Sequence, residues 1–273
     1  MRLFSAVSFL VGLTLFGLNL YGLTKSLRPE GLNPEVLRFS QNDLTLSKNE
    51  FFSNSLRLNS ESDYEYATRL TYVISNGMAH VHWERFEPSV FHQTVPVWEN
   101  FILFLMGKYS GIPEFERYHF TIPEKSIERG VGLCGDASML LSELLNREEI
   151  ENSIITIPGH VMVQVTIDGN KTLLDPDFGV VLQQDVESYL ADPNLLETEY
   201  NLSGFKGNGE KVVSKGIQSG KVEFWAGTKH FVTKKYYFER VSYFLIWLIP
   251  IFLLLLPLFI KIRQKRKHEG LIK

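Results

Sequence analysis

Two long apolar stretches, one towards each end of the chain, restrict the folding of this sequence more than any other feature. They run from Leu3 to Leu23 and from Val241 to Ile260, and neither contains a charged residue. An α-helix of about 20 residues crosses a hydrocarbon layer of about 30 Å. We therefore expect transmembrane helices within residues 1–24 and 241–260, with the chain between them folded in water.

Charge is unevenly distributed along the sequence. Residues 261–273 form a basic tail, and the net charge of the whole chain is −3, so the part between the apolar stretches is acidic. Basic residues accumulate on the cytoplasmic side of membrane helices. We therefore expect both termini to be cytoplasmic and the intervening part to be extracytoplasmic. An acidic body also argues against a nucleic-acid partner, because phosphates are bound by basic surfaces.

The first apolar stretch has a second interpretation, as a cleaved signal peptide. A signal peptide has a shorter apolar core, followed by small residues at the cleavage site. Here Asn19 and Tyr21 stand where those small residues are expected. We therefore expect an uncleaved anchor and an integral membrane protein with two spans.

Between the apolar stretches, the residue pattern predicts one α+β domain at residues 62–200. Residues 25–61 are rich in Asn, Ser and Leu without a clear period, which predicts a stalk with one short helix. Residues 201–240 predict a C-terminal extension made of loops and one or two short strands. Helices are expected to start at the capping box Ser62 to Glu65 and to span about 97–109 and 134–146. Alternating residues then predict strands at 153–157, 160–167 and 172–174.

The chemistry of this domain centres on Cys134, the single cysteine of the chain. It lies in the first turn of a predicted helix, where free amides and the helix dipole stabilise a thiolate. His160 begins a predicted strand, on the face opposite its valines, and Asp175 ends the next strand. The order Cys, His, Asp is that of a thiol nucleophile, a general base and an orienting carboxylate.

Two aspartates compete for the third role. Asp168-Gly169 predicts a tight hairpin, and strict pairing around it places His160 opposite Asp177. Asp175 is then the diagonal neighbour of His160 on the same face. A carboxylate at either position can orient the imidazole, so pairing alone leaves both open.

The motifs around these residues resemble the transglutaminase-like family, whose fold is a papain-type thiol core in which a Cys-bearing helix packs on an antiparallel sheet. The matching residues are Gly132-Leu133-Cys134, His160 and Asp175-Pro176. The resemblance covers about residues 62–182 and implies that Asp175, not Asp177, is the third member. Met162 departs from the family, which usually has tryptophan there.

The resemblance implies a cysteine-dependent amide hydrolase or acyltransferase acting on a peptide bond or a glutamine side chain of a protein or peptide substrate. The amide of Cys134 and an upstream donor would hold the oxyanion. Trp98 is the candidate donor, with Trp83 and Gln93 as alternatives. A non-catalytic module that binds or assembles a cell-envelope complex is the rival interpretation.

No cofactor and no metal ion are expected. His80 and His82 form the only histidine pair that suggests a metal site. On a helix, side chains two positions apart point in different directions and cannot share an ion. On a strand they could, but the sequence offers no evident third ligand.

Overall fold

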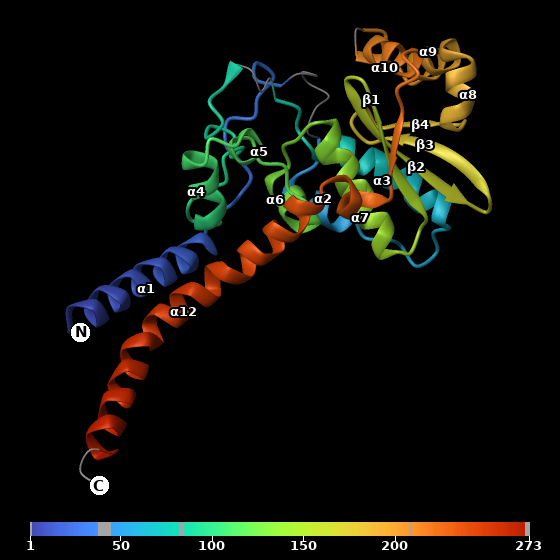
Figure 1. Cartoon of the computed structure of the whole chain (residues 1–273). Helices are drawn as coiled ribbons and strands as arrows, with labels where there is room; N and C mark the ends of the chain where they lie inside the picture. Colours follow the sequence, from blue (N-terminus) through green and yellow to red (C-terminus); the bar gives the residue numbers. More distant parts are fainter. Residues whose placement is uncertain (1, 38–44, 82–84, 208, 271–273) are drawn as a thin grey trace. The chain divides into compact units, whose positions relative to one another are not determined.

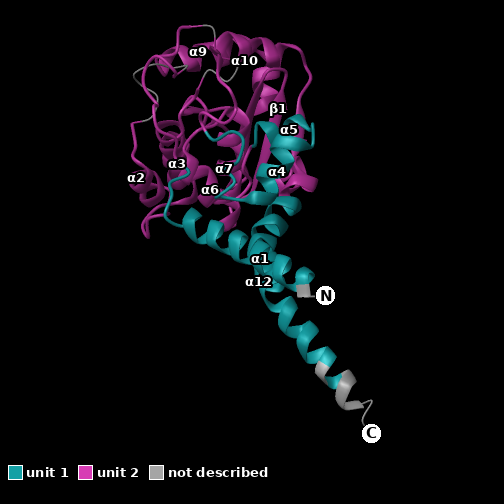
Figure 2. Ribbon diagram, turned by 90° about the vertical axis from the view of Figure 1, so that its left-hand side faces the viewer, with its two compact units in different colours: residues 1–27, 92–118, 237–273 teal, residues 28–91, 119–236 magenta. Residues whose placement is uncertain are grey.

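The computed structural model describes residues 2–37, 45–81, 85–207 and 209–270 (Figure 1). The chain forms two compact units that each combine distant parts of the sequence (Figure 2). Unit 1 contains residues 1–27, 92–118 and 237–273, and unit 2 contains residues 28–91 and 119–236. The predicted division into stalk, domain and extension differs from this arrangement, since residues 92–118 belong with the apolar ends.

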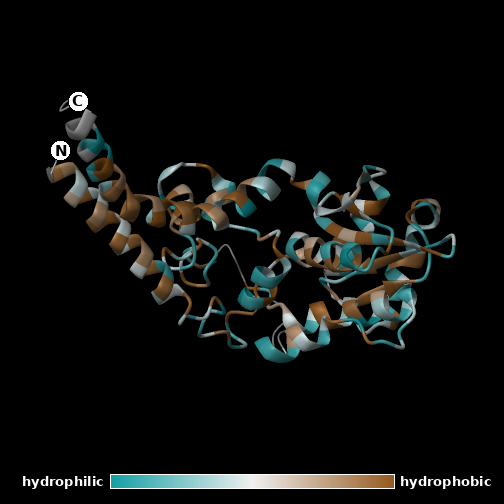
Figure 3. Ribbon diagram, turned by 90° about the horizontal axis from the view of Figure 1, so that it is seen from below, coloured by the Kyte–Doolittle hydropathy of each residue, from teal (hydrophilic) through white to brown (hydrophobic). Residues whose placement is uncertain are grey.

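Unit 1 contains the two apolar helices. Within the described residues, the helices long and apolar enough to cross a membrane are α1, Arg2–Gly22, and α12, Thr233–Gly270. Hydrophobic residues dominate both helices (Figure 3). The apolar stretch that begins at Val241 is therefore the middle of a longer helix, which starts at Thr233 and continues into the basic tail.

The loop-rich part of unit 1 holds α4, Phe101–Tyr109, and the short α5, Pro113–Glu116. The helix expected from Val97 begins four residues later because Asn100 caps it. The Asn100 side chain accepts hydrogen bonds from the amides of Ile102 and Leu103, both at 3.1 Å.

Unit 2 is built around an antiparallel sheet with the strand order β4-β3-β2-β1-β5. Its strands are β1, Asn152–Ile157; β2, His160–Ile167; β3, Asn170–Asp175; β4, Val180–Leu182; and β5, Glu223–Trp225. The expected hairpin between β2 and β3 is present. Asp168 and Gly169 have φ values of 52° and 78°, the left-handed pair of a tight hairpin turn. This sheet, with the helices on it, confirms an α+β fold.

Helices cover both faces of the sheet (Figure 1). On one face, α3, Asp63–Gly77, and α7, Cys134–Arg147, pack on Val163 and Val165. On the other face, α8, Val186–Ala191, α9, Pro193–Leu202, and α10, Gly209–Gln218, pack on Met162. The alternation in β2 therefore separates two buried cores. The helix α10 also replaces the loops expected after residue 204.

The segment predicted as a stalk contributes to the core of unit 2. It contains α2, Lys48–Asn54, whose Phe51 is completely buried against α3. Two further short helices complete the unit: α6, Pro123–Arg129, before α7, and α11, Gly227–Phe231, before α12.

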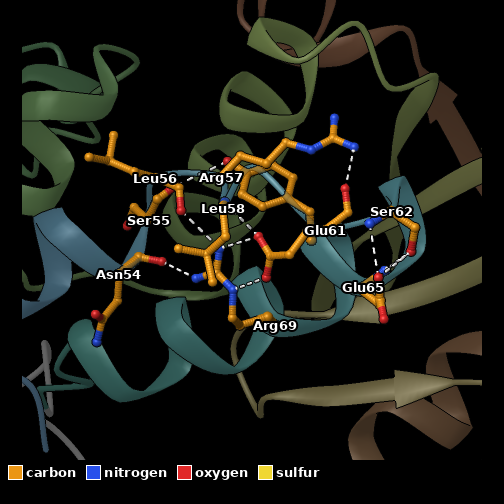
Figure 4. Close-up of polar contacts among 10 residues, drawn as sticks. Asn54, Ser55, Leu56, Arg57, Leu58, Glu61, Ser62, Glu65 and Arg69 are labelled. Carbon is orange, nitrogen blue, oxygen red and sulfur yellow. Dashed lines mark hydrogen bonds and ion pairs between the residues drawn. The ribbon is translucent and has the colours of Figure 1, made fainter.

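An ion pair organises the connection between α2 and α3 (Figure 4). The guanidinium of Arg69 donates to the carboxylate of Glu61 and to the carbonyls of Asn54 and Leu56. The hydrogen bond from Arg69 is the main reason that the pKa of Glu61 falls to about 2. The expected capping box is present beside this pair, because Ser62 N donates to the Glu65 carboxylate at 2.9 Å.

Candidate active site

The segment before Cys134 is held by a short stretch of parallel pairing. Ala79 N donates to Gly130 O at 2.8 Å, and Gly132 N donates to Ala79 O at 3.0 Å. A Cβ atom at Gly132 would collide with the side chains of Met78 and Asp136, so only glycine fits there. The backbone entering α7 is thus fixed on both sides, and Cys134 follows as its first residue, half-buried.

A buried carboxylate fixes the first turn of α7. Asp136 is 1% exposed, and its carboxylate accepts from Leu133 N at 2.9 Å, from His119 Nδ1 at 2.7 Å and from Arg129 Nη2 at 3.2 Å. Burial alone raises the pKa of Asp136, but the charges and hydrogen bonds of His119 and Arg129 lower it overall. The sequence interpretation missed this cluster. Its detectable signal was an aspartate three residues after the helix cap.

His160, the first residue of β2, lies beside both of the residues expected from the sequence. Its Nε2 lies 2.7 Å from Asp175 Oδ2, and the Cys134 thiol is near enough to act on the pKa of the ring. Since Asp175 occupies Nε2, Nδ1 is the nitrogen left for the thiol. Burial on its own lowers the pKa of His160, but the charge and hydrogen bond of Asp175, together with Cys134, raise it well above its usual value.

Asp175 is completely buried and has a donor on every side of its carboxylate. Oδ1 accepts the backbone N–H groups of Asp177, at 3.0 Å, and Phe178, at 3.2 Å. Oδ2 accepts from His160 and from the hydroxyl of Tyr200. Such a carboxylate is held firmly in place and can hold the imidazole in one orientation.

Tyr200 comes from α9 and was not identified from the sequence. Its ring belongs to an aromatic cluster in which Phe178 contacts His160 at 5.6 Å and Tyr200 at 5.4 Å between ring centroids. Burial, followed by the charge of Asp175, raises the pKa of Tyr200 well above its usual value. The phenol therefore keeps its proton and donates a hydrogen bond to Asp175.

Asp177, the competing aspartate, has a different histidine. Its Oδ1 lies 2.6 Å from His80 Nε2, and both side chains are buried. The β2–β3 register runs as expected, from Ile167 opposite Asn170 to Val163 opposite Leu174, so Asp175 reaches His160 diagonally.

Trp98 as the oxyanion donor and the pair of His80 and His82 stay predictions from the sequence. Trp98 and Gln93 belong to unit 1, not to the unit that holds Cys134. Within unit 1, Trp98 contacts the His92 ring and Gln93 accepts from Arg117. His82 and Trp83 lie outside the described residues. The amide of Cys134 itself remains a donor, because first-turn amides have no partner within their helix.

Comparison with protein-family models, with curated proteins and with solved structures finds no match to this chain. The chemistry must therefore be argued from the site. A half-buried thiol that acts on the pKa of a buried histidine, which is itself paired to a carboxylate with four hydrogen-bond donors, is suited to form a thiolate and to move a proton.

Proposed function

We propose that unit 2 is a cysteine-dependent amide hydrolase or acyltransferase, similar in its core to the transglutaminase-like family. Cys134 is the nucleophile, His160 the general acid and base, and Asp175 the orienting carboxylate. The observation that carries this proposal is one buried imidazole that is paired to Asp175 at 2.7 Å and whose pKa the Cys134 thiol also raises. A merely structural cysteine would be buried among apolar groups, without a titratable partner.

The reaction follows from the proton positions. The Cys134 thiolate attacks the amide carbonyl, and the His160 imidazolium gives its proton to the nitrogen as the C–N bond breaks. The amine leaves and a thioester remains on Cys134. Neutral His160 then accepts a proton from water or from a second amine, which attacks the thioester and regenerates the thiolate. The Cys134 amide, at the start of α7, stabilises the oxyanion in both steps.

The apolar helices support a membrane location for this reaction. Both α1 and α12 are long enough to span a bilayer, and most of their surface is exposed. With the basic tail in the cytoplasm, two spans give a cytoplasmic N-terminus and an extracytoplasmic unit 2. Its substrate is then a protein or peptide of that compartment.

The test is labelling of the full chain, purified in detergent, with a thiol-directed alkylating agent at about pH 6. A free cysteine, with a pKa of about 8.5, reacts slowly at this pH. We expect fast labelling of the wild type, with a loss of at least about tenfold in His160→Ala. His230→Gln is the matched control, because His230 lies in unit 2 and contacts the Ala226 amide.

The outcomes separate the two rival functions. Fast labelling that requires His160, followed by release of ammonia or amine from a glutamine-containing peptide library, supports the enzyme. Labelling at the rate of a free thiol in both the wild type and His160→Ala refutes it and favours the non-catalytic binding module. Exchange with an added primary amine distinguishes acyl transfer from hydrolysis.

A further inference from the structure

The carboxylate of Asp175 is shared between two donors on one oxygen. His160 Nε2 and the Tyr200 hydroxyl both donate to Oδ2, while the backbone N–H groups of Asp177 and Phe178 occupy Oδ1. The backbone bonds fix the carboxylate in place whatever happens at Oδ2. Tyr200 is therefore not needed to hold Asp175, and its hydroxyl competes with the imidazole for the same negative charge.

The fold presents Tyr200 rigidly to this oxygen. Its side chain is fully buried, and the rings of Phe178 and Phe205 pack against it with centroid distances of 5.4 and 6.4 Å. The other titratable groups acting on the phenol are Asp177 and Tyr189. No cationic side chain is among these groups, so the phenol serves Asp175 as a neutral donor.

We infer that Tyr200 is a positioning residue that weakens the hydrogen bond between Asp175 and the protonated ring of His160. This inference rests on the proposed function. A second strong donor on Oδ2 disperses the charge of that oxygen and leaves less of it for the imidazolium. His160 must release its proton to the leaving amine, so a carboxylate that binds the imidazolium too tightly slows that step.

The test is the pH titration of His160, followed by the imidazole carbon signals of the full chain labelled with ¹³C-histidine. Tyr200→Phe keeps the ring and removes the hydroxyl. We expect the His160 midpoint to rise by about one pH unit, as for loss of a charge-assisted hydrogen bond. Tyr189→Phe is the matched control, because the Tyr189 hydroxyl is bonded to the Gln184 amide. It should leave the midpoint in place.

A second measurement tests the same role of Tyr200 in case Tyr200→Phe does not fold. Incorporating 3-fluorotyrosine into the wild type and into Tyr189→Phe makes the phenol more acidic and a stronger donor, so the His160 midpoint should fall. An unchanged midpoint in both experiments, or a midpoint that falls in Tyr200→Phe and rises with 3-fluorotyrosine, overturns the role of Tyr200. The labelling comparison with His160→Ala reports the proposed function separately, because it does not involve Tyr200.

An independent observation in unit 1 concerns α1. Two of its polar side chains are buried in this mostly apolar helix: Ser8 is 6% exposed and Asn19 is 4% exposed. The Ser8 hydroxyl donates to Leu253 O at 2.8 Å, and the Asn19 amide donates to Ile246 O. Gly12 lies between them, where a Cβ would be 3.0 Å from Pro250 O.

Each of the two accepting carbonyls in α12 lies four residues before a proline. Ile246 lies four residues before Pro250, and Leu253 lies four residues before Pro257. Proline has no N–H, so the carbonyl four residues earlier loses its helical donor. In a bilayer no water replaces that donor, and a neighbouring helix must supply it.

We propose that α1 is retained in the mature protein as the partner that completes α12. A cleaved signal peptide has no reason to place its polar side chains on the carbonyls that two prolines leave free. Retention also makes unit 1 a fixed two-helix anchor, in which Gly12 allows close approach of the backbones.

Two measurements test this proposal. Intact mass spectrometry of the protein recovered from membranes through a C-terminal tag should detect a chain that includes residues 3–22. Asn19→Leu should lower the melting temperature in detergent, whereas Thr14→Leu, at an exposed position of α1, should not. A mature chain that begins after Gly22, or equal melting temperatures for the two variants, overturns it.

Discussion

Asp177 donates its backbone N–H to the carboxylate of Asp175 at 3.0 Å, while its own carboxylate binds a different histidine. Two aspartates of one turn thus serve His160 and His80 separately. The His80–Asp177 pair joins this turn to the segment that pairs with Gly130 and Gly132 just before Cys134. Asp175 therefore belongs to the proposed active site, whereas Asp177 has a structural role.

This division predicts opposite effects for the two conservative amides. Asp175→Asn removes the charge that orients His160, so labelling of Cys134 at about pH 6 should fall by about 10³-fold, by analogy with carboxylate loss in other triads. Asp177→Asn keeps the backbone N–H to Asp175, so labelling should change by less than about fivefold. Its melting temperature should fall, because His80 loses its buried partner. Silencing of Cys134 by Asp177→Asn alone would contradict the assignment.

The raised pKa of His160 predicts how stability depends on pH. Burial alone lowers this pKa, but Asp175 and Cys134 raise it, so the folded state keeps a proton that the unfolded state releases above about pH 6.5. The stabilising contribution is fully present below that pH and disappears as the pH rises through the folded value. The difference in unfolding free energy between the wild type and His160→Gln should therefore be largest near pH 6 and decrease above it. His230→Gln should show no such trend.

Much of unit 2 could be predicted from local signals. The capping box at Ser62, the helix that begins at Cys134 and the Asp168-Gly169 hairpin are each encoded within a few residues. The hairpin register then places Asp175 diagonal to His160. These features need no knowledge of distant parts of the chain.

The remaining features depend on contacts between segments far apart in sequence. Tyr200 reaches Asp175 only because α9 folds back onto the sheet, and no period or motif marks it. The burial of Phe51 was not predicted, since the short helix of seven residues in the expected stalk gives too short a pattern to reveal its core face. The role of α10 was missed because two glycines and two adjacent valines lower the helical propensity of residues 209–218.

The Arg69–Glu61 pair predicts sensitivity to acid. The hydrogen bond of Arg69 lowers the pKa of Glu61 to about 2, so this group stabilises the fold above about pH 4.5 and loses its contribution as the pH falls towards 2. Glu61→Gln should lower the unfolding free energy at neutral pH by roughly 1–2 kcal/mol, with a difference that shrinks in acid. Chemical denaturation across this pH range measures it, with the exposed Glu30→Gln as control. A difference independent of pH would contradict the prediction.

Arg129 should be essential for the stability of the first turn of α7. It is 1% exposed, donates to Asp136 and to Val131 O, and lies over the Phe120 ring. Arg129→Met leaves the Asp136 charge with less compensation and should cost about 3–5 kcal/mol of unfolding free energy. Arg147→Met, which breaks the exposed pair with Glu124, should cost less than about 1 kcal/mol. Equal losses for the two variants would show that the buried cluster does not hold the helix start.

The arrangement of charges predicts the topology. The helix α12 continues from the apolar stretch into the basic tail, and such a tail is retained on the cytoplasmic side. A reporter that is active only in the cytoplasm should therefore be active when fused after Lys273. The same reporter inserted at Gly220, in the exposed turn between α10 and β5, should be inactive, and one active only after export should give the reverse pattern. Activity of the exported reporter at Lys273 would place the tail outside and reverse the location proposed for Cys134.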